Sequence, residues 1–190
     1  NMGDITVRFF PDEAPKAVKN FIELSKQGYY DGVTFHRVIS DFMIQGGDPR
    51  GDGTGGTSIY GEGFEVETSS DLYAFRGALM MARSSQPNSN GSQFFIVQAS
   101  TLGITDEYFH QIELYNQQQG SGVTSFPENV KEKYKEVGGY PSLDGLYTVF
   151  GFVIDGMDIV DQIAAVETDS NDMPLTPVIV DKIEITTYQG

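Results

Sequence analysis

Cysteine is absent from this chain of 190 residues, which excludes disulfide bonds, thiol catalysis and thiolate metal sites. Basic residues are scarce: 12 lysines and arginines stand against 27 aspartates and glutamates, and the formal net charge is -15. Proteins bind nucleic acid and anionic lipid through Lys and Arg, so a surface of this sign disfavours both partners. We attribute the charge to solubility, and steering of basic unfolded segments is the alternative that stays open.

Long hydrophobic runs are missing as well. No stretch approaches the roughly 20 apolar residues that a transmembrane helix needs, and the first residues do not resemble a signal peptide. Because the chain begins with Asn1 instead of methionine, we expect a processed or trimmed form from which a signal sequence or lipid anchor could have been lost. The location therefore stays open between the cytoplasm and an exported, membrane-tethered form.

Several catalytic and metal-binding motifs are also absent. Residues 51–56 are rich in glycine but lack the Gly-Lys-Ser/Thr of a phosphate loop, and no Gly-x-Ser-x-Gly occurs. Asp48 and Asp52 do not have the spacing of a calcium loop. His36 and His110 lie far apart, so we expect no metal site and no cofactor. We interpret His36 as a structural histidine whose ring is satisfied by hydrogen bonds.

The hydrophobic pattern predicts many short strands. Alternation of apolar and polar residues, or short apolar runs bounded by turn residues, predicts strands near 5–9, 34–38, 42–45, 78–82, 94–97, 149–154 and 178–187. Helical spacing predicts one helix over 14–24, ended by Gly28, and a second after Gly156. Two helices far apart and many short strands favour a closed β architecture over βαβ units. We expect a single domain, residues 1–190.

Residues 103–141 predict a helical insertion within that domain. Tyr108, Ile112 and Tyr115 have the spacing of one helix face, and a second helix is expected from Pro127 to Val137. Residues 117–122 are interpreted as a flexible connector between them. The insertion is either a passive cap or an element that gates the groove or binds a partner, and we favour the passive cap.

The most informative stretch is residues 35–48, Phe-His-Arg-Val-Ile-Ser-Asp-Phe-Met-Ile-Gln-Gly-Gly-Asp. It sets the permanently charged Arg37 and the carboxamide of Gln45 among apolar residues, so both are expected to point into an apolar groove. Residues 77–83 and 88–97 are a second informative region. Further segments that fit one family pattern follow in chain order at 3–5, 14–21, 28–32, 143–145, 148–151 and 156–160. Together they resemble the cyclophilins, the peptidyl-prolyl cis-trans isomerases, apart from about 101–142. The longer form with a helical insertion is associated with bacterial members.

The resemblance implies an eight-stranded antiparallel β-barrel closed at each end by a helix, with the site on its outer face. Arg37 matches the catalytic arginine, and Gln45 matches the residue that orients it and meets a substrate carbonyl. Four residues match the proline pocket: Phe42, Met43, Phe95 and Leu143. Neighbours on a strand face opposite sides, so Phe94 is expected in the core when Phe95 faces the groove.

The remaining matched positions surround that pocket. Gln93 matches a polar wall residue, and Ala82 and Arg83 match the edge where substrate backbone docks. A neighbouring side pocket is implied for Ser89, Asn90, Gly91 and Ser92. Three residues depart from the family pattern: Tyr147 replaces the usual histidine, Ser142 replaces a frequent tryptophan, and Arg83 replaces asparagine.

We therefore expect an isomerase that accelerates rotation of X-Pro bonds in unfolded or partly folded chains. The alternative is a cyclophilin-fold module that binds proline peptides, or acts as a chaperone, with little turnover. The expected partners are proline-containing peptides and unfolded protein segments. Cyclosporin-type ligands are also implied, with binding weakened by Ser142. Nothing in the sequence demands a partner subunit, so we expect a monomer.

Overall fold

The computed structural model describes residues 1–187. Its strands are β1 (Thr6–Phe9), β2 (Arg37–Ile39), β3 (Met43–Gly46), β4 (Ala78–Met81), β5 (Phe94–Val97) and β6 (Val149–Asp155). Its helices are α1 (Pro15–Lys26), α2 (Asp106–Gln119), α3 (Glu128–Val137), α4 (Met157–Ala164) and the short 3₁₀ helix η1 (Pro141–Leu143). Over these residues, no helix has the length and apolarity needed to cross a membrane.

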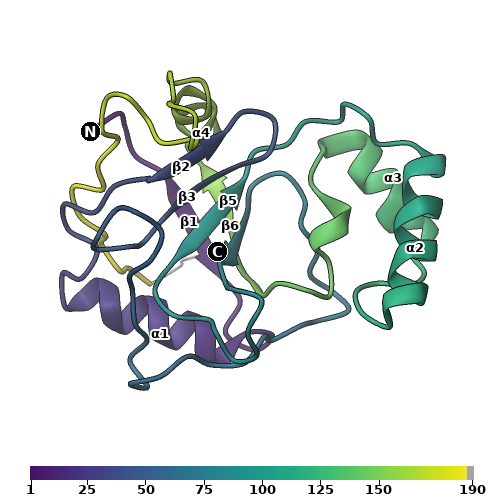
Figure 1. Ribbon diagram of the computed structural model, residues 1–190, viewed down its shortest axis with the longest axis horizontal. Coiled ribbons are helices and arrows are strands. Elements are labelled where there is room, and N and C mark those ends of the chain that lie inside the picture. The colour runs from purple at the N-terminus through teal and green to yellow at the C-terminus, as the bar shows by residue number, and fades with distance from the viewer. Residues whose placement is uncertain (188–190) are drawn as a thin grey trace.

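The six strands form one antiparallel sheet in the order β1-β6-β4-β5-β3-β2. Helices α1 and α4 lie at opposite ends of this sheet (Figure 1). The prediction of a mainly β fold with two helices far apart is confirmed. The six strands do not close into a ring among the described residues, so closure with eight strands stays a prediction.

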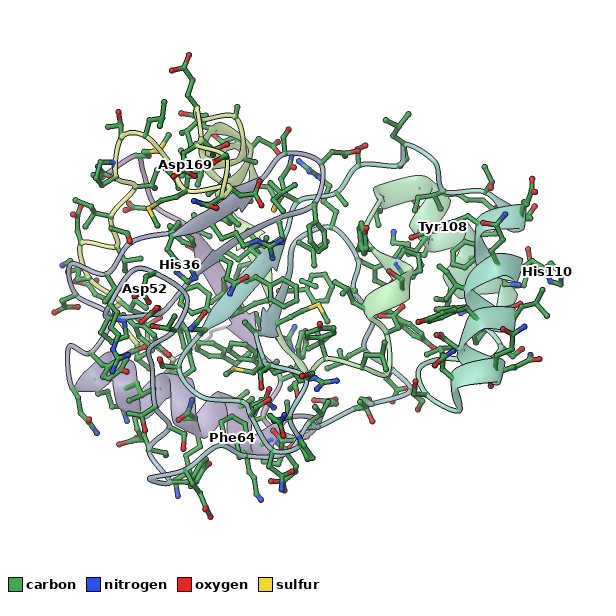
Figure 2. The ribbon with its side chains drawn as sticks, viewed as in Figure 1. His36, Asp52, Phe64, Tyr108, His110 and Asp169 are labelled. Atoms are coloured by element: carbon green, nitrogen blue, oxygen red, sulfur yellow. The ribbon has the colours of Figure 1, made fainter. Side chains whose placement is uncertain are left out.

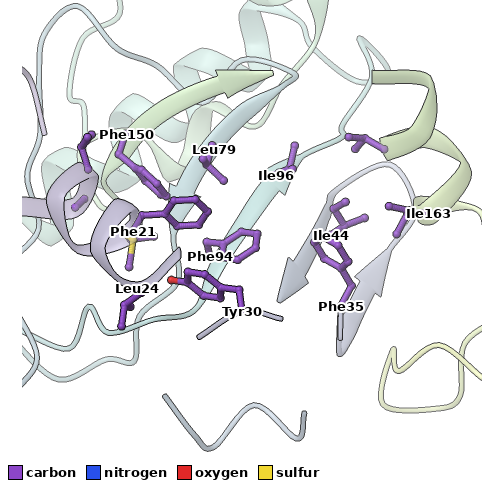
Figure 3. Close-up of a cluster of buried hydrophobic side chains, with 14 of the residues drawn as sticks. Phe21, Leu24, Tyr30, Phe35, Ile44, Leu79, Phe94, Ile96, Phe150 and Ile163 are labelled. Atoms are coloured by element: carbon purple, nitrogen blue, oxygen red, sulfur yellow. The ribbon is translucent and has the colours of Figure 1, made fainter. Parts of the chain in front are cut away.

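One face of the sheet carries the main hydrophobic core. Helix α1 places its buried residues, among them Phe21, against the sheet residues Leu79, Phe94 and Phe150. Figure 3 shows these aromatic rings gathered between α1 and the strands. Phe94 meets Phe21 edge to face, with ring centroids 5.3 Å apart. Such pairs stabilise a core beyond the burial of their area, and Phe94 is indeed the core member of its strand neighbours.

The prediction of a strand over 178–187 is wrong. Only residues 178–180 pair, through the bridge of Thr34 with Ile179 and hydrogen bonds between Val178, Val180 and residues 32–35. The partner segment, residues 32–35, begins at a turn at Gly32, whose φ is 78°. Residues 181–187 therefore have no extended segment to pair with. The strand expected over 34–38 begins only at Arg37, and Thr34 forms an isolated bridge with Ile179 instead.

The two helices predicted within residues 103–141 are confirmed, and this segment, here called the insertion, has a core of its own. Helices α2 and α3 stand beside the sheet, on the right of Figure 1. Five buried residues hold them together: Phe109, Ile112, Phe126, Val130 and Tyr134.

Two details of the insertion were predicted wrongly. The buried face of α2 is Phe109, Ile112 and Asn116, while Tyr115 is 61% exposed. The glutamines of the expected connector continue α2 to Gln119, since glutamine favours helix. Gly120 then ends the helix in the left-handed conformation.

Candidate active site

The face of the sheet opposite the main core aligns the predicted site residues in rows. Arg37 on β2 lies opposite Gln45 on β3, and Gln45 lies opposite Phe95 on β5. Phe95 in turn lies opposite Met80 on β4. Residues opposite each other on antiparallel strands point to the same side of a sheet. One charged group, one amide and two apolar side chains therefore line a single row across four strands.

An apolar floor lies along this row. Met43 and Phe95 are buried, and Leu143 of η1 packs in the same cluster at 9% exposure. Phe42 and Tyr147 are half-buried at its border. The ring of Tyr147 meets Phe95 edge to face, with centroids 5.9 Å apart. The structure thus brings together all four residues expected in the pocket, and Tyr147 with them.

Arg37 stands at the rim of this floor with its side chain 45% exposed. Its Nε lies 3.5 Å from Oδ2 of Asp172. Strand β2 is the edge of the sheet, and the Val38 N–H donates to the Asp172 carbonyl over 2.8 Å. Asp172 has φ 62°, a left-handed conformation that aspartate tolerates better than most residues.

Sequence reasoning missed Asp172. The polar run from Asp169 to Asp172 predicts a turn, because aspartate, serine and asparagine favour turns. The Asp169 carboxylate accepts hydrogen bonds from the N–H groups of Asn171 and Met173, which builds that turn. No signal in the sequence places the turn beside Arg37.

Gln45 belongs to a relay of amides. Its Nε2 donates to Oε1 of Gln93 over 3.0 Å, and Gln93 Nε2 donates to the carbonyls of Gly53 and Gly55 at 3.0 and 2.8 Å. The buried carboxylate of Asp48 accepts hydrogen bonds from backbone N–H groups in the same loop. The glycine-rich loop of residues 51–56 therefore supports Gln93. Gln45 lies opposite Arg37 on the neighbouring strand, but its side-chain amide donates to Gln93. Within residues 1–187, the two side chains form no hydrogen bond with each other.

The comparisons with known proteins agree with this geometry. The model of the family "Cyclophilin type peptidyl-prolyl cis-trans isomerase/CLD" matches residues 1–185. The chain belongs to the cyclophilin family. A Staphylococcus saprophyticus protein named as a peptidyl-prolyl cis-trans isomerase is 47% identical over 185 residues, covering 97% of this chain and 88% of that protein.

Two further proteins are similar to this cyclophilin. A Streptococcus pyogenes protein named as a bifunctional phosphatase/peptidyl-prolyl cis-trans isomerase is 48% identical over 187 residues, and the match covers 97% of this chain but 37% of that protein. A solved Cryptosporidium parvum cyclophilin, crystallised in the presence of the dipeptide Ala-Pro, has a TM-score of 0.75 and 35% identity, with 99% and 96% of the two chains covered. Family and relatives indicate peptidyl-prolyl cis-trans isomerase activity.

The edge that the resemblance assigns to substrate docking carries the departure at Arg83. Its Nε donates to the Leu146 carbonyl over 2.9 Å, and its guanidinium carbon lies 5.2 Å from the centre of the Tyr147 ring. The Ala82 N–H donates to the Gln93 carbonyl over 3.0 Å. Two of the family departures, Arg83 and Tyr147, are thus in contact. A cation held over an aromatic face is stabilised by the negative potential of the ring's quadrupole.

The four residues of the expected side pocket are tied into hydrogen bonds. Ser92 Oγ donates to the Gly47 carbonyl over 2.6 Å, and the Gly91 carbonyl accepts from Asn20. Ser89 Oγ donates within its own turn, to the Gln86 carbonyl. Asn90 donates to the Glu65 carbonyl and is fully buried. Ser142, the third departure, is half-buried on η1 beside Leu143.

The prediction for His36 is wrong in one respect. The residue is only 5% exposed, but neither ring nitrogen has a hydrogen-bond partner among the described residues. The oxygens of the neighbouring Asp48 are occupied by backbone N–H groups, and burial lowers the pKa of His36. Figure 2 shows His36 over the sheet and His110 far away on α2. Within residues 1–187, no three His, Asp or Glu side chains could hold a metal together.

A buried carboxyl group, Asp144, adjoins the apolar floor and was also missed. It follows Leu143 and is 3% exposed. Its oxygens accept hydrogen bonds from the Ala74 N–H over 2.7 Å and from the Tyr134 hydroxyl over 2.5 Å. Burial raises the pKa of Asp144 to about 7 in spite of these donors. The Leu-Asp-Gly sequence at 143–145 contributed to the family resemblance, but nothing in it identified Tyr134 as the partner.

A recess of about 420 Å³ lies elsewhere, between α3 and residues 70–75. Tyr73, Phe75 and Val130 line it together with polar residues. None of the site residues predicted from the sequence borders it. The residues that the resemblance assigns to the site therefore lie along the row of Arg37, Gln45 and Phe95 and not at this recess.

Proposed function

We propose that this cyclophilin accelerates rotation of X-Pro bonds in unfolded or partly folded chains, with Arg37 as the catalytic residue. Rotation has a barrier of about 18–20 kcal/mol, because the C–N bond has partial double-bond character. In the twisted state that character is lost and the nitrogen lone pair becomes available. A donor that bonds the nitrogen only then lowers the barrier without tightening the ground state. This step needs no nucleophile, metal or proton transfer.

The observation that carries this proposal is the position of the Arg37 guanidinium at the rim of an apolar floor. Arginine stays charged at any working pH, and its planar fork can be held at a fixed angle. Asp172 contacts Nε of the guanidinium, and within residues 1–187 no side chain or carbonyl forms a hydrogen bond with either terminal nitrogen, which leaves both for a substrate.

The other matched residues have proposed roles around a bound X-Pro segment. The proline ring is held by five residues: Phe42, Met43, Phe95, Leu143 and Tyr147. The peptide backbone is held by four more: Gln45, Ala82, Arg83 and Gln93. These assignments are supported by their position on one face of the sheet and around one apolar cluster.

The barrel is proposed to close through residues 32–35 and 178–180. The Gly32 N–H donates to the Val180 carbonyl, the Val180 N–H to the Val33 carbonyl, and the Phe35 N–H to the Val178 carbonyl. Ile179 also bonds Asn1, which precedes β1 at the opposite edge of the sheet. These contacts support an eight-stranded ring in a single domain of residues 1–190.

Two further proposals concern partners. A monomer is sufficient for the site, because all its proposed residues come from one chain. Cyclosporin-type ligands should bind weakly, because Ser142 offers neither the apolar wall nor the indole donor of tryptophan at that position.

NMR exchange spectroscopy on a short X-Pro peptide tests the function. The proposal predicts that cis-trans exchange, which takes tens of seconds or longer without an enzyme, becomes fast when the protein is added. Shifted peptide signals with uncatalysed exchange would instead identify a binding module, and attention would move to Tyr147, Ser142 and the insertion.

A further inference from the structure

The helical insertion is fastened to the turn that carries two walls of the proposed proline pocket. This turn, residues 143–147, begins with Leu143 and ends with Tyr147. The Leu143 carbonyl accepts hydrogen bonds from the Leu146 and Tyr147 N–H groups at 3.1 and 3.2 Å. A shift of the turn would therefore move both walls together.

The first link is a buried hydrogen bond. Tyr134 of α3 is fully buried, and its hydroxyl donates to Oδ2 of Asp144 over 2.5 Å. The second oxygen of that carboxyl accepts from the Ala74 N–H over 2.7 Å. Asp144 thus ties the 143–147 turn to the insertion on one side and to the segment before β4 on the other. A buried acceptor that loses its donor is costly, so this link is a strong one.

The second link is a close backbone approach. A Cβ on Gly145 would lie 3.1 Å from the carbonyl carbon of Gly122 in the loop between α2 and α3. Gly145 also has φ 73°, a conformation that favours glycine. The loop of the insertion therefore rests directly on the middle of the 143–147 turn.

The third link reaches the opposite wall of the pocket. Tyr140, where the insertion returns to the barrel, places its ring centroid 4.4 Å from that of Phe42. Its N–H donates to the Ala74 carbonyl over 2.8 Å. Arg37 and Gln45, in contrast, sit on β2 and β3 and have no hydrogen bond or ion pair with residues 103–141 in the described part of the chain.

We infer that the insertion positions the walls of the proline pocket, with Tyr134 as the positioning residue that holds Leu143 and Tyr147 through Asp144. This inference rests on the proposed function, since it assigns the pocket to X-Pro substrates. It replaces the passive cap favoured from the sequence with a defined task. The consequence is that the insertion governs substrate affinity, while Arg37 governs the rate of the bound substrate.

Tyr134→Phe tests the inference, because it deletes one hydroxyl and keeps the ring that packs 4.4 Å from Phe75. We expect KM for an X-Pro peptide to rise roughly threefold to tenfold, as a lost buried hydrogen bond allows. We expect kcat to stay within about twofold, since the row of Arg37 is untouched. The matched control is Tyr115→Phe, on the exposed side of α2, which should change neither constant.

A second variant keeps the inference testable if Tyr134→Phe does not fold. Tyr140→Leu removes the ring contact with Phe42 and leaves the buried hydrogen bond intact, and it too should raise KM with little change in kcat. Unchanged KM in both variants, or a fall in kcat with KM unchanged, would overturn the inference. If the wild-type protein bound the peptide without catalysis, the proposed function would fail, and the Kd of the same variants would still decide the inference.

Discussion

At the scale of single residues, the proposed chemistry depends on how Arg37 is held. Its side chain is half exposed, and an exposed ion pair contributes little to stability, typically 0–1 kcal/mol. The contact with Asp172 therefore matters more for orientation than for folding. The turn from Asp169 to Asp172 gives the carboxylate a fixed place at the edge of β2, where its own backbone carbonyl bonds Val38.

We predict that Asp172→Asn lowers kcat roughly twofold to fivefold and leaves KM within about twofold. Asparagine tolerates the left-handed φ of this position, so the turn should persist. Added salt should lower the wild-type kcat towards that of the variant, because salt screens an exposed pair. Asp12→Asn, an exposed acid before α1, serves as the control for loss of one charge. Equal kcat in wild type and Asp172→Asn at low salt would refute the orienting role.

At the scale of elements, the sequence pattern predicted the features that depend on residues close together in the chain. The boundaries of β5 and the separation of Phe94 from Phe95 follow from the period of a strand, and helical spacing over 14–24 predicts the start of α1 to within one residue. The face of α2 did not follow, because α3 and Tyr73 decide which side of α2 is buried. The strand over 178–187 failed since pairing depends on a partner segment far away in the chain.

The candidate site also has a part that the sequence predicted and a part that it did not. Arg37 and the apolar residues Met43, Phe95 and Leu143 were named from three separate segments, because the family resemblance joins those segments. The contacts of Asp172 with Arg37 and of Tyr134 with Asp144 were not, because each joins an ordinary-looking residue to the site across elements. Neither aspartate nor tyrosine is unusual in its own segment, so the sequence holds no local signal for these pairs.

The glycine-rich loop is the element that yields a stability prediction. Asp48 is fully buried, and its carboxylate accepts from the N–H groups of Arg50, Gly53 and Gly55 at 2.8, 2.7 and 3.1 Å. We predict that Asp48→Ala lowers the free energy of unfolding by about 2–4 kcal/mol, because three backbone N–H groups lose a buried, charged acceptor. Asp52→Ala is the matched control, since Asp52 is exposed and its carboxylate accepts hydrogen bonds from the N–H and the hydroxyl of Thr54. Equal losses in denaturant titrations of the two variants would contradict the supporting role of Asp48.

At the scale of the whole molecule, stability should depend on pH through Asp144. Its ordinary pKa is 3.8, and burial raises the pKa to about 7 in the folded protein. Tyr134, Tyr73 and the Ala74 N–H face this carboxyl. Between these two values the folded state binds a proton that the unfolded state releases. The contribution to stability is therefore fully present below about pH 4 and lost as pH rises through 7.

His36 acts in the opposite direction over part of this range. Burial lowers the pKa of His36 below its ordinary 6.5, so the folded state resists protonation and stability from this group rises as pH approaches 6.5. The difference between wild type and Asp144→Asn separates the two, since His36 is common to both. We predict that this difference changes with pH by up to about 1.4 kcal/mol per unit between pH 5 and 7. A difference independent of pH, measured by urea unfolding, would show that Asp144 is ionised throughout.

The most direct test of the central claim is NMR exchange spectroscopy on an X-Pro peptide with wild-type protein and with Arg37→Ala. Losing a preorganised donor at the place where charge develops typically costs about a hundredfold to a thousandfold in rate. We predict a loss of this size with peptide affinity within a few-fold of wild type, because the apolar floor of Met43, Phe95 and Leu143 is unchanged. Wild-type exchange rates in Arg37→Ala would contradict the account.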